Sequence, residues 1–131
     1  MKTYRVILET GPKDTPRSHE LKVAKIIAEY FKTDIVFLRT SSMKTPDLKV
    51  GNIVWELKSP IGDGKNTIHN TFKTARKQSA NIIIDLSRCK MHQTKAISNI
   101  KHIYSKRRNK SGKLLIITKT RRVLDISDKK S

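Results

Sequence analysis

The spacing of hydrophobic and polar side chains changes along the 131-residue chain, and each spacing predicts a different element. In HELKVAKIIAEYFK, residues 19–32, apolar side chains recur every three or four positions, which predicts an amphipathic helix with one apolar stripe. A second helix is predicted to start at a cap formed by Asn66 or Thr67, and a third covers about 92–107. Their core-facing side chains are expected to be Ile68, Phe72 and Ala75, and Ala96, Ile97, Ile100, Ile103 and Tyr104.

Shorter stretches predict strands. Residues 4–9 alternate loosely between apolar and polar side chains, and residues 34–40 also have the composition of a strand. The continuous apolar run at 80–86 is typical of a strand covered on both faces, and 113–126 predict two strands around a turn. The order of these elements predicts one α/β domain over residues 1–131, with a mixed central β-sheet flanked by α-helices.

Two segments are expected to lie outside these elements. Residues 11–18, GPKDTPRS, predict a loop, and Ser18 is placed to cap the helix that follows. Residues 127–131 predict a frayed C-terminal tail. No internal repeat, low-complexity block or linker divides the chain.

The stretch PDLKVGNIVWELKSP, residues 46–60, predicts a β-hairpin. Gly51-Asn52 suits a two-residue primed turn, which pairs Val50 with Ile53. Because strand side chains alternate between faces, the hairpin has an apolar face made of Leu48, Val50, Ile53, Trp55 and Leu57. The other face carries Asp47, Lys49, Val54, Glu56 and Lys58.

On this charged face, Asp47 is expected directly opposite Glu56. Like charges in this position destabilise a strand pair unless positive charge lies between them, and a divalent cation supplies such charge. The backbone carbonyl of Leu57 offers a further oxygen ligand, and Lys58 can orient a water molecule or offset phosphate charge. This set predicts a site for phosphodiester cleavage. A solvated, charged hairpin is the simpler alternative.

Glu20 lies on the apolar stripe of the first predicted helix, where an unpaired carboxylate is costly to bury. It either joins the hairpin carboxylates or lies in the first helical turn and interacts with the helix dipole.

The loop after the hairpin leads to a helix N-terminus, where backbone N–H groups favour anions. The residues expected to contact substrate phosphate there are Ser59, Lys65, Asn66 and Thr67. We interpret His69 as an ordinary surface histidine and Trp55 as a core residue. Asp85 is interpreted as a buried residue that accepts hydrogen bonds.

Composition points to a polyanionic partner. The chain has 29 Lys and Arg against 11 Asp and Glu, a formal net charge of +18. Low aromatic content favours contact with phosphates over base stacking. Cys89 is the single cysteine, so an internal disulfide and a cysteine-based zinc site are excluded. No apolar run approaches the roughly 20 residues that span a bilayer, and membrane binding is the weakest interpretation of the charge.

The order of Glu20, Pro46-Asp47 and Glu56-Leu57-Lys58 resembles the E…PD…(D/E)xK motif of the PD-(D/E)XK nuclease superfamily. Longer strings, HELKVAKIIAEYF, TPDLKVGNIVWELKSPIGDGKNTIHN and KQSANIIIDLSR, resemble the C-terminal tRNA nuclease domain of contact-dependent growth inhibition toxins. The similarity covers roughly residues 18–120.

This resemblance implies a PD-(D/E)XK-like fold and a metal-dependent endoribonuclease that cleaves tRNA. The residues it implies for the site are Glu20, Asp47, Glu56 and Lys58, with Glu20 a further candidate metal ligand. It also implies that Asn70 and Lys73, on a polar helix face, bind the substrate. An all-oxygen metal site favours Mg²⁺, with Mn²⁺ and Zn²⁺ as alternatives.

The resemblance also implies a cognate immunity protein, and an acidic one suits so basic a domain. It implies that the domain ends a larger protein, delivered from the producing bacterium to the cytoplasm of a target cell. Two other functions stay open at this point: a DNA endonuclease with the same site, and a non-catalytic basic module that binds nucleic acid.

Overall fold

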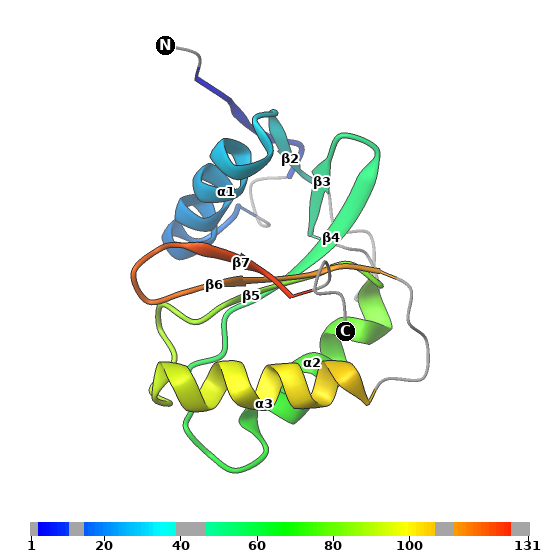
Figure 1. Ribbon diagram of the computed structural model, residues 1–131. Helices are drawn as coiled ribbons and strands as arrows, with labels where there is room; N and C mark the ends of the chain where they lie inside the picture. The colour runs from blue at the N-terminus through cyan, green and yellow to red at the C-terminus, as the bar shows by residue number, and fades with distance from the viewer. Residues whose placement is uncertain (1–2, 11–14, 39–46, 107–111, 127–131) are drawn as a thin grey trace.

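The computed structural model describes residues 3–10, 15–38, 47–106 and 112–126 (Figure 1). Its elements are β1 (Val6–Leu8), α1 (Ser18–Phe31), β2 (Ile35–Phe37), β3 (Leu48–Val50), β4 (Ile53–Lys58), α2 (Thr67–Gln78), β5 (Ile82–Asp85), α3 (Gln93–Ser105), β6 (Leu114–Ile117) and β7 (Val123–Asp125). The strands form one seven-stranded sheet in chain order. The predicted α/β fold with a mixed sheet is therefore confirmed.

The direction of each strand follows from the length of its connection. Strands β2, β3 and β4 are antiparallel, as is β7 on β6, whereas the pairs β1–β2, β4–β5 and β5–β6 are parallel. Parallel neighbours need a crossover, and α1, α2 and α3 are the three crossovers. No helix in the described ranges is long and apolar enough to cross a bilayer.

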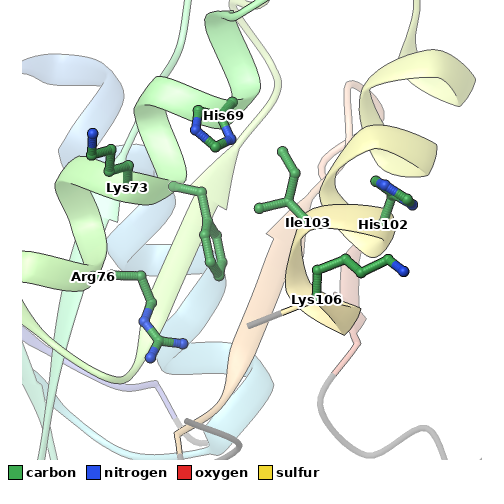
Figure 2. Close-up of a pocket in the computed structure, with 7 residues that line it drawn as sticks. His69, Lys73, Arg76, His102, Ile103 and Lys106 are labelled. Atoms are coloured by element: carbon green, nitrogen blue, oxygen red, sulfur yellow. The ribbon is translucent and has the colours of Figure 1, made fainter. Parts of the chain in front are cut away.

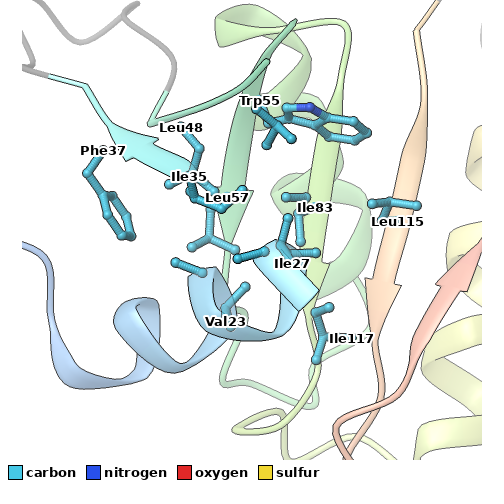
Figure 3. Packing of buried hydrophobic residues seen from close by; sticks show 13 residues of the cluster. Val23, Ile27, Ile35, Phe37, Leu48, Trp55, Leu57, Ile83, Leu115 and Ile117 are labelled. Carbon is cyan, nitrogen blue, oxygen red and sulfur yellow. The ribbon is translucent and has the colours of Figure 1, made fainter. Parts of the chain in front are cut away.

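The helices cover opposite faces of the sheet, with α1 on one side and α2 and α3 on the other (Figure 1). Under α1, Val23 and Ile27 pack on strand residues that include Ile83 (Figure 3). Ile82 and Ile84 point to the opposite face and pack under α2 and α3. Strand β5 is therefore buried on both faces, as its continuous apolar run predicted.

The spacing of apolar side chains predicted the core-facing residues of α2 and α3 correctly. The buried residues of α2 are Ile68, Phe72 and Ala75, and those of α3 are Ala96, Ile100 and Tyr104, with Ile97 and Ile103 partly buried. The predicted cap of the first helix was wrong, because Ser18 is its first residue and Arg17 is the N-cap. Strands are shorter than predicted, and residues 11–14, 39–46 and 127–131 lie outside the described part of the chain.

The hairpin has the predicted register: Val50 pairs with Ile53 and Leu48 with Trp55. Gly51 takes a positive φ of 61°, as a primed turn requires. One expectation for its apolar face was wrong, since Ile53 is 45% exposed. It lies beside the turn and takes no part in the buried cluster under α1 that contains Leu48 and Trp55.

Gly112 is expected to be the less replaceable of two glycines with positive φ. Its φ is 89°, and an added Cβ would overlap the backbone carbonyl of Ala80. Gly112→Ala should lower the free energy of unfolding by at least about 3 kcal/mol, from the left-handed backbone and the clash together. Urea denaturation followed by circular dichroism measures this change.

Gly51→Ala is the matched control, because Gly51 also has positive φ but nothing lies within 4 Å of its added Cβ. We expect a loss of about 1–2 kcal/mol there, from the backbone alone. Equal losses at the two positions would contradict the role given to the Ala80 carbonyl.

Candidate active site

Asp47 and Glu56 lie across the hairpin from each other. Leu48 pairs with Trp55, so the residues one step further along, Asp47 and Glu56, face each other. The Leu57 backbone N–H donates a hydrogen bond to Asp47 Oδ2 at 3.0 Å, which fixes that carboxyl against β4. Glu56 is only 1% exposed. The structure therefore brings together the two carboxylates that the hairpin pattern placed on one face.

Lys58 supplies positive charge to this pair. Its Nζ lies 3.1 Å from Glu56 Oε2, and its side chain remains 27% exposed. Lys58 follows Glu56 by two strand positions, so both side chains project from the same face of β4. The ammonium group can therefore contact Glu56 while its remaining donors stay open to solvent or to a ligand.

Burial, with a neighbouring negative charge in each case, makes both carboxyls harder to ionise. Burial, and then the charge of Asp47, raises the pKa of Glu56 from 4.5 to about 7, against the opposing effect of Lys58. Burial also raises the pKa of Asp47, and the charge of Glu20 adds to this, while the Leu57 N–H opposes it. The pair thus holds protons more tightly than isolated carboxyls do.

Glu20 has features of both interpretations given to it. It lies in the first turn of α1, where its Oε1 accepts a hydrogen bond from the Arg17 backbone N–H at 2.8 Å. Its charge also acts on Asp47, so the first turn of α1 lies near the hairpin carboxylates. Within the described ranges, however, no three His, Cys, Asp or Glu side chains cluster closely enough to hold a metal ion.

A divalent cation nevertheless fits the two hairpin carboxylates. Glu56 Oε1 is buried and has no hydrogen-bond partner, a costly condition for a carboxylate oxygen. A cation between Glu56 and Asp47 would satisfy that oxygen and offset the charge of Asp47, which raises the pKa of Glu56. With the Leu57 carbonyl the ligand set is all oxygen, which suits Mg²⁺ or Mn²⁺.

A cavity of about 330 Å³ adjoins Lys58. Among the predicted substrate residues, Ser59 and Asn70 line it. Thr71 and Thr74 line it too, and the sequence interpretation missed both. The signal for Thr74 was helical spacing, because a residue four positions after Asn70 lies on the same helix face.

The other predicted substrate residues lie apart from this cavity. Lys65 and Asn66 line a second cavity of about 320 Å³, and Lys73 lines a third. Asn66 is the N-cap of α2 but makes no capping hydrogen bond with its side chain. Thr67 lines none of the three, and its backbone N–H donates to the Gly64 carbonyl at 3.1 Å.

Asp85 is a buried hydrogen-bonding residue, as preferred from the sequence. It accepts hydrogen bonds from the Ser87 backbone N–H and the Ser87 hydroxyl, both at 3.0 Å. The Ser59 hydroxyl donates to it at 3.4 Å. Asp85 therefore ties the segment after β4 to the C-terminal end of β5, and Ser59 has a structural contact besides its place in the Lys58 cavity.

Fold and site together define an α/β protein with a carboxylate pair and a lysine on one hairpin strand. Residues 44–123 match the family described as the contact-dependent growth inhibition CdiA C-terminal domain. This match covers more than half of the chain, so the protein belongs to that family. A search of curated proteins found no match.

The fold also resembles a solved structure, the CdiA-CT/CdiI toxin and immunity complex from Burkholderia pseudomallei. The TM-score is 0.60 at 18% sequence identity, and the similarity covers 90% of this chain and 96% of the other. Almost the whole of each chain therefore shares one fold, although few residues are identical.

The raised pKa of Glu56 predicts a specific pH dependence of stability. Between pH 4.5 and about 7 the folded protein keeps the proton while the unfolded chain releases it, so rising pH favours unfolding. Relative to Glu56→Gln, the wild type should lose on the order of 3 kcal/mol across this range. Urea midpoints from pH 4 to 8 measure the difference between the two proteins.

Glu29→Gln is the control, because Glu29 is exposed on α1 and its substitution removes the same charge. Its stability curve should run parallel to that of the wild type. A parallel curve for Glu56→Gln as well would show that the carboxyl of Glu56 does not titrate with a raised pKa.

Proposed function

We propose that this domain is a growth-inhibition toxin that hydrolyses phosphodiester bonds in tRNA with the help of a divalent cation, preferably Mg²⁺. The observation that carries the proposal is the buried Glu56 carboxylate opposite Asp47, with one oxygen unpaired and the other 3.1 Å from Lys58. A chain with a net charge of +18 is suited to a polyanionic substrate. The resemblance to PD-(D/E)XK nucleases gives the same assignment of these residues.

Each residue has a distinct role in this proposal. Asp47, Glu56 and the Leu57 carbonyl would hold the cation, which supplies an acidic bound water and charge stabilisation at the phosphate. Lys58 lies between Glu56 and the adjoining cavity, where its ammonium group can donate to a phosphate oxygen or orient the attacking water. Ser59 and Asn70 line the same cavity and offer neutral donors. Glu20 adjusts the charge on Asp47 from α1.

The proposed biological setting follows from the family. A CdiA C-terminal domain in contact-dependent growth inhibition would be carried at the end of a larger protein and act in the cytoplasm of the target cell. A solved relative of the same fold is held in a complex with an immunity protein, so we propose a cognate inhibitor here as well. An acidic inhibitor would associate fastest with so basic a domain.

Cleavage of total tRNA tests the proposal directly. The wild type with Mg²⁺ should give discrete fragments, and EDTA should abolish them. Glu56→Gln and Lys58→Met should each slow cleavage by at least about 100-fold, because Glu56 would hold the cation and Lys58 supplies positive charge at the reacting phosphate. Fragments are quantified by denaturing gel electrophoresis, with Glu29→Gln as the variant that keeps wild-type activity.

Two other functions are outcomes of the same experiment. Duplex DNA cut while tRNA remains intact would identify a DNA endonuclease, because the carboxylate site contacts phosphate and does not itself distinguish the two sugars. Binding of both without cleavage, unchanged in Glu56→Gln, would identify a non-catalytic basic module. Cleavage that persists in EDTA would contradict the role of the cation.

A further inference from the structure

A groove between α2 and α3 lies apart from the cavity beside Lys58, although it holds three of the predicted substrate residues, Lys65, Asn66 and Lys73. Its main cavity, of about 500 Å³, has Phe72 and Ile103 among its lining residues together with Lys73, Arg76 and Lys106. In Figure 2, Lys73 and Arg76 come from α2, and Ile103 and Lys106 come from α3. The neighbouring 320 Å³ cavity shares His69, His102 and Ile103 with it and extends it to Lys65 and Asn66 at the start of α2. We call these two cavities together the α2–α3 groove.

The lining of the α2–α3 groove is basic with an apolar component. Among the residues that the structure describes, no Asp or Glu lines either cavity. The Arg76 guanidinium lies over the Phe72 ring, with Cζ 5.8 Å from the ring centroid. This contact orients the guanidinium without using its N–H groups, which can then donate hydrogen bonds to a phosphate. Such a surface suits an anionic chain that also has apolar or aromatic groups.

Helix α2 connects the α2–α3 groove to the candidate active site. Asn70 and Thr74 on one helix face line the cavity beside Lys58, whereas His69, Lys73 and Arg76 line the groove. These two sets follow the spacings of three and four residues that define neighbouring helix faces. Because a helix with its side chains is only about 10–12 Å wide, a strand of a few nucleotides can reach from one cavity to the other.

We propose that the α2–α3 groove binds a phosphate-bearing strand of the RNA substrate next to the segment that is cut. Lys73, Arg76 and Lys106 each neutralise one phosphate, and Phe72 and Ile103 contact the nucleotides between them. This proposal rests on the proposed function, since it assigns the groove to the same substrate. An acidic protein surface is the competing occupant that the test must separate.

The test measures tRNA binding in EDTA, where the proposed cleavage is absent, by fluorescence anisotropy over a range of salt concentrations. In a plot of log affinity against log salt concentration, each phosphate contact contributes roughly 0.7 to the steepness of the slope. The triple variant Lys73→Gln, Arg76→Gln, Lys106→Gln should therefore reduce the magnitude of that slope by about 2. Its dissociation constant at 0.1 M salt should rise on the order of 100-fold. Lys73→Arg with Lys106→Arg should keep the wild-type slope.

The matched control removes three positive charges from a different surface. Lys22, Lys25 and Arg121 line a separate cavity beside α1, on the other side of the sheet. The control replaces both lysines with Gln and Arg121 with Asn, which tolerates the positive φ of 66° found there. An equal loss of binding in this control would overturn the proposal, because it would show that only net charge matters.

Two further measurements keep the result decisive. Urea midpoints check folding, and the double variant Lys73→Gln, Lys106→Gln, which keeps Arg76 over Phe72, should still flatten the slope by about 1.4. Competition by polyglutamate as strong as that by an oligoribonucleotide of equal charge would identify a general polyanion surface and overturn the proposal. If the groove variants lose binding but the wild type cuts no RNA, the proposed function fails while the groove assignment stands.

Discussion

The charge on Glu56 is the constraint on which the rest of this structure depends. A carboxylate that is 1% exposed and faces a second carboxylate is costly in a folded protein. Two features of the chain reduce that cost, the Lys58 ammonium at 3.1 Å and the Leu57 N–H on Asp47, and the cost that remains raises the pKa of Glu56 to about 7. Glu56 Oε1 keeps no hydrogen-bond partner, and this is the oxygen that the proposed cation would satisfy.

The fold holds this pair in place from both sides. The apolar face of the hairpin packs under α1 through Leu48, Trp55 and Leu57, which orients the charged face away from that core. Helix α2 lies on the opposite side and lines the cavity beside Lys58. One face of α2 lines the cavity beside Lys58 and the neighbouring face lines the α2–α3 groove. A single helix can therefore position residues for substrate binding as well as for the proposed cleavage.

Local patterns predicted more of the fold than of the site. Three helices, the buried strand β5 and the hairpin register all follow from periodicity, because burial of one face imposes a period on the side chains. The errors occurred at the ends of elements. Arg17 replaces Ser18 as the cap since Glu20 accepts the hydrogen bond of the Arg17 backbone N–H, and Ile53 is exposed because the core under α1 does not extend to the turn.

By itself, then, the sequence determined the alternation that places Asp47 opposite Glu56 and Lys58 two positions further on, because strand geometry leaves one register for an apolar face. Only the tertiary structure decided which other residues accompany them. Thr71 and Thr74 adjoin Lys58 because the crossover from β4 to β5 packs α2 beside the hairpin strand, and Lys106 adjoins Arg76 because α3 packs on α2. Such neighbours are far apart in the chain, and packing against a shared sheet, rather than local spacing, brings them together.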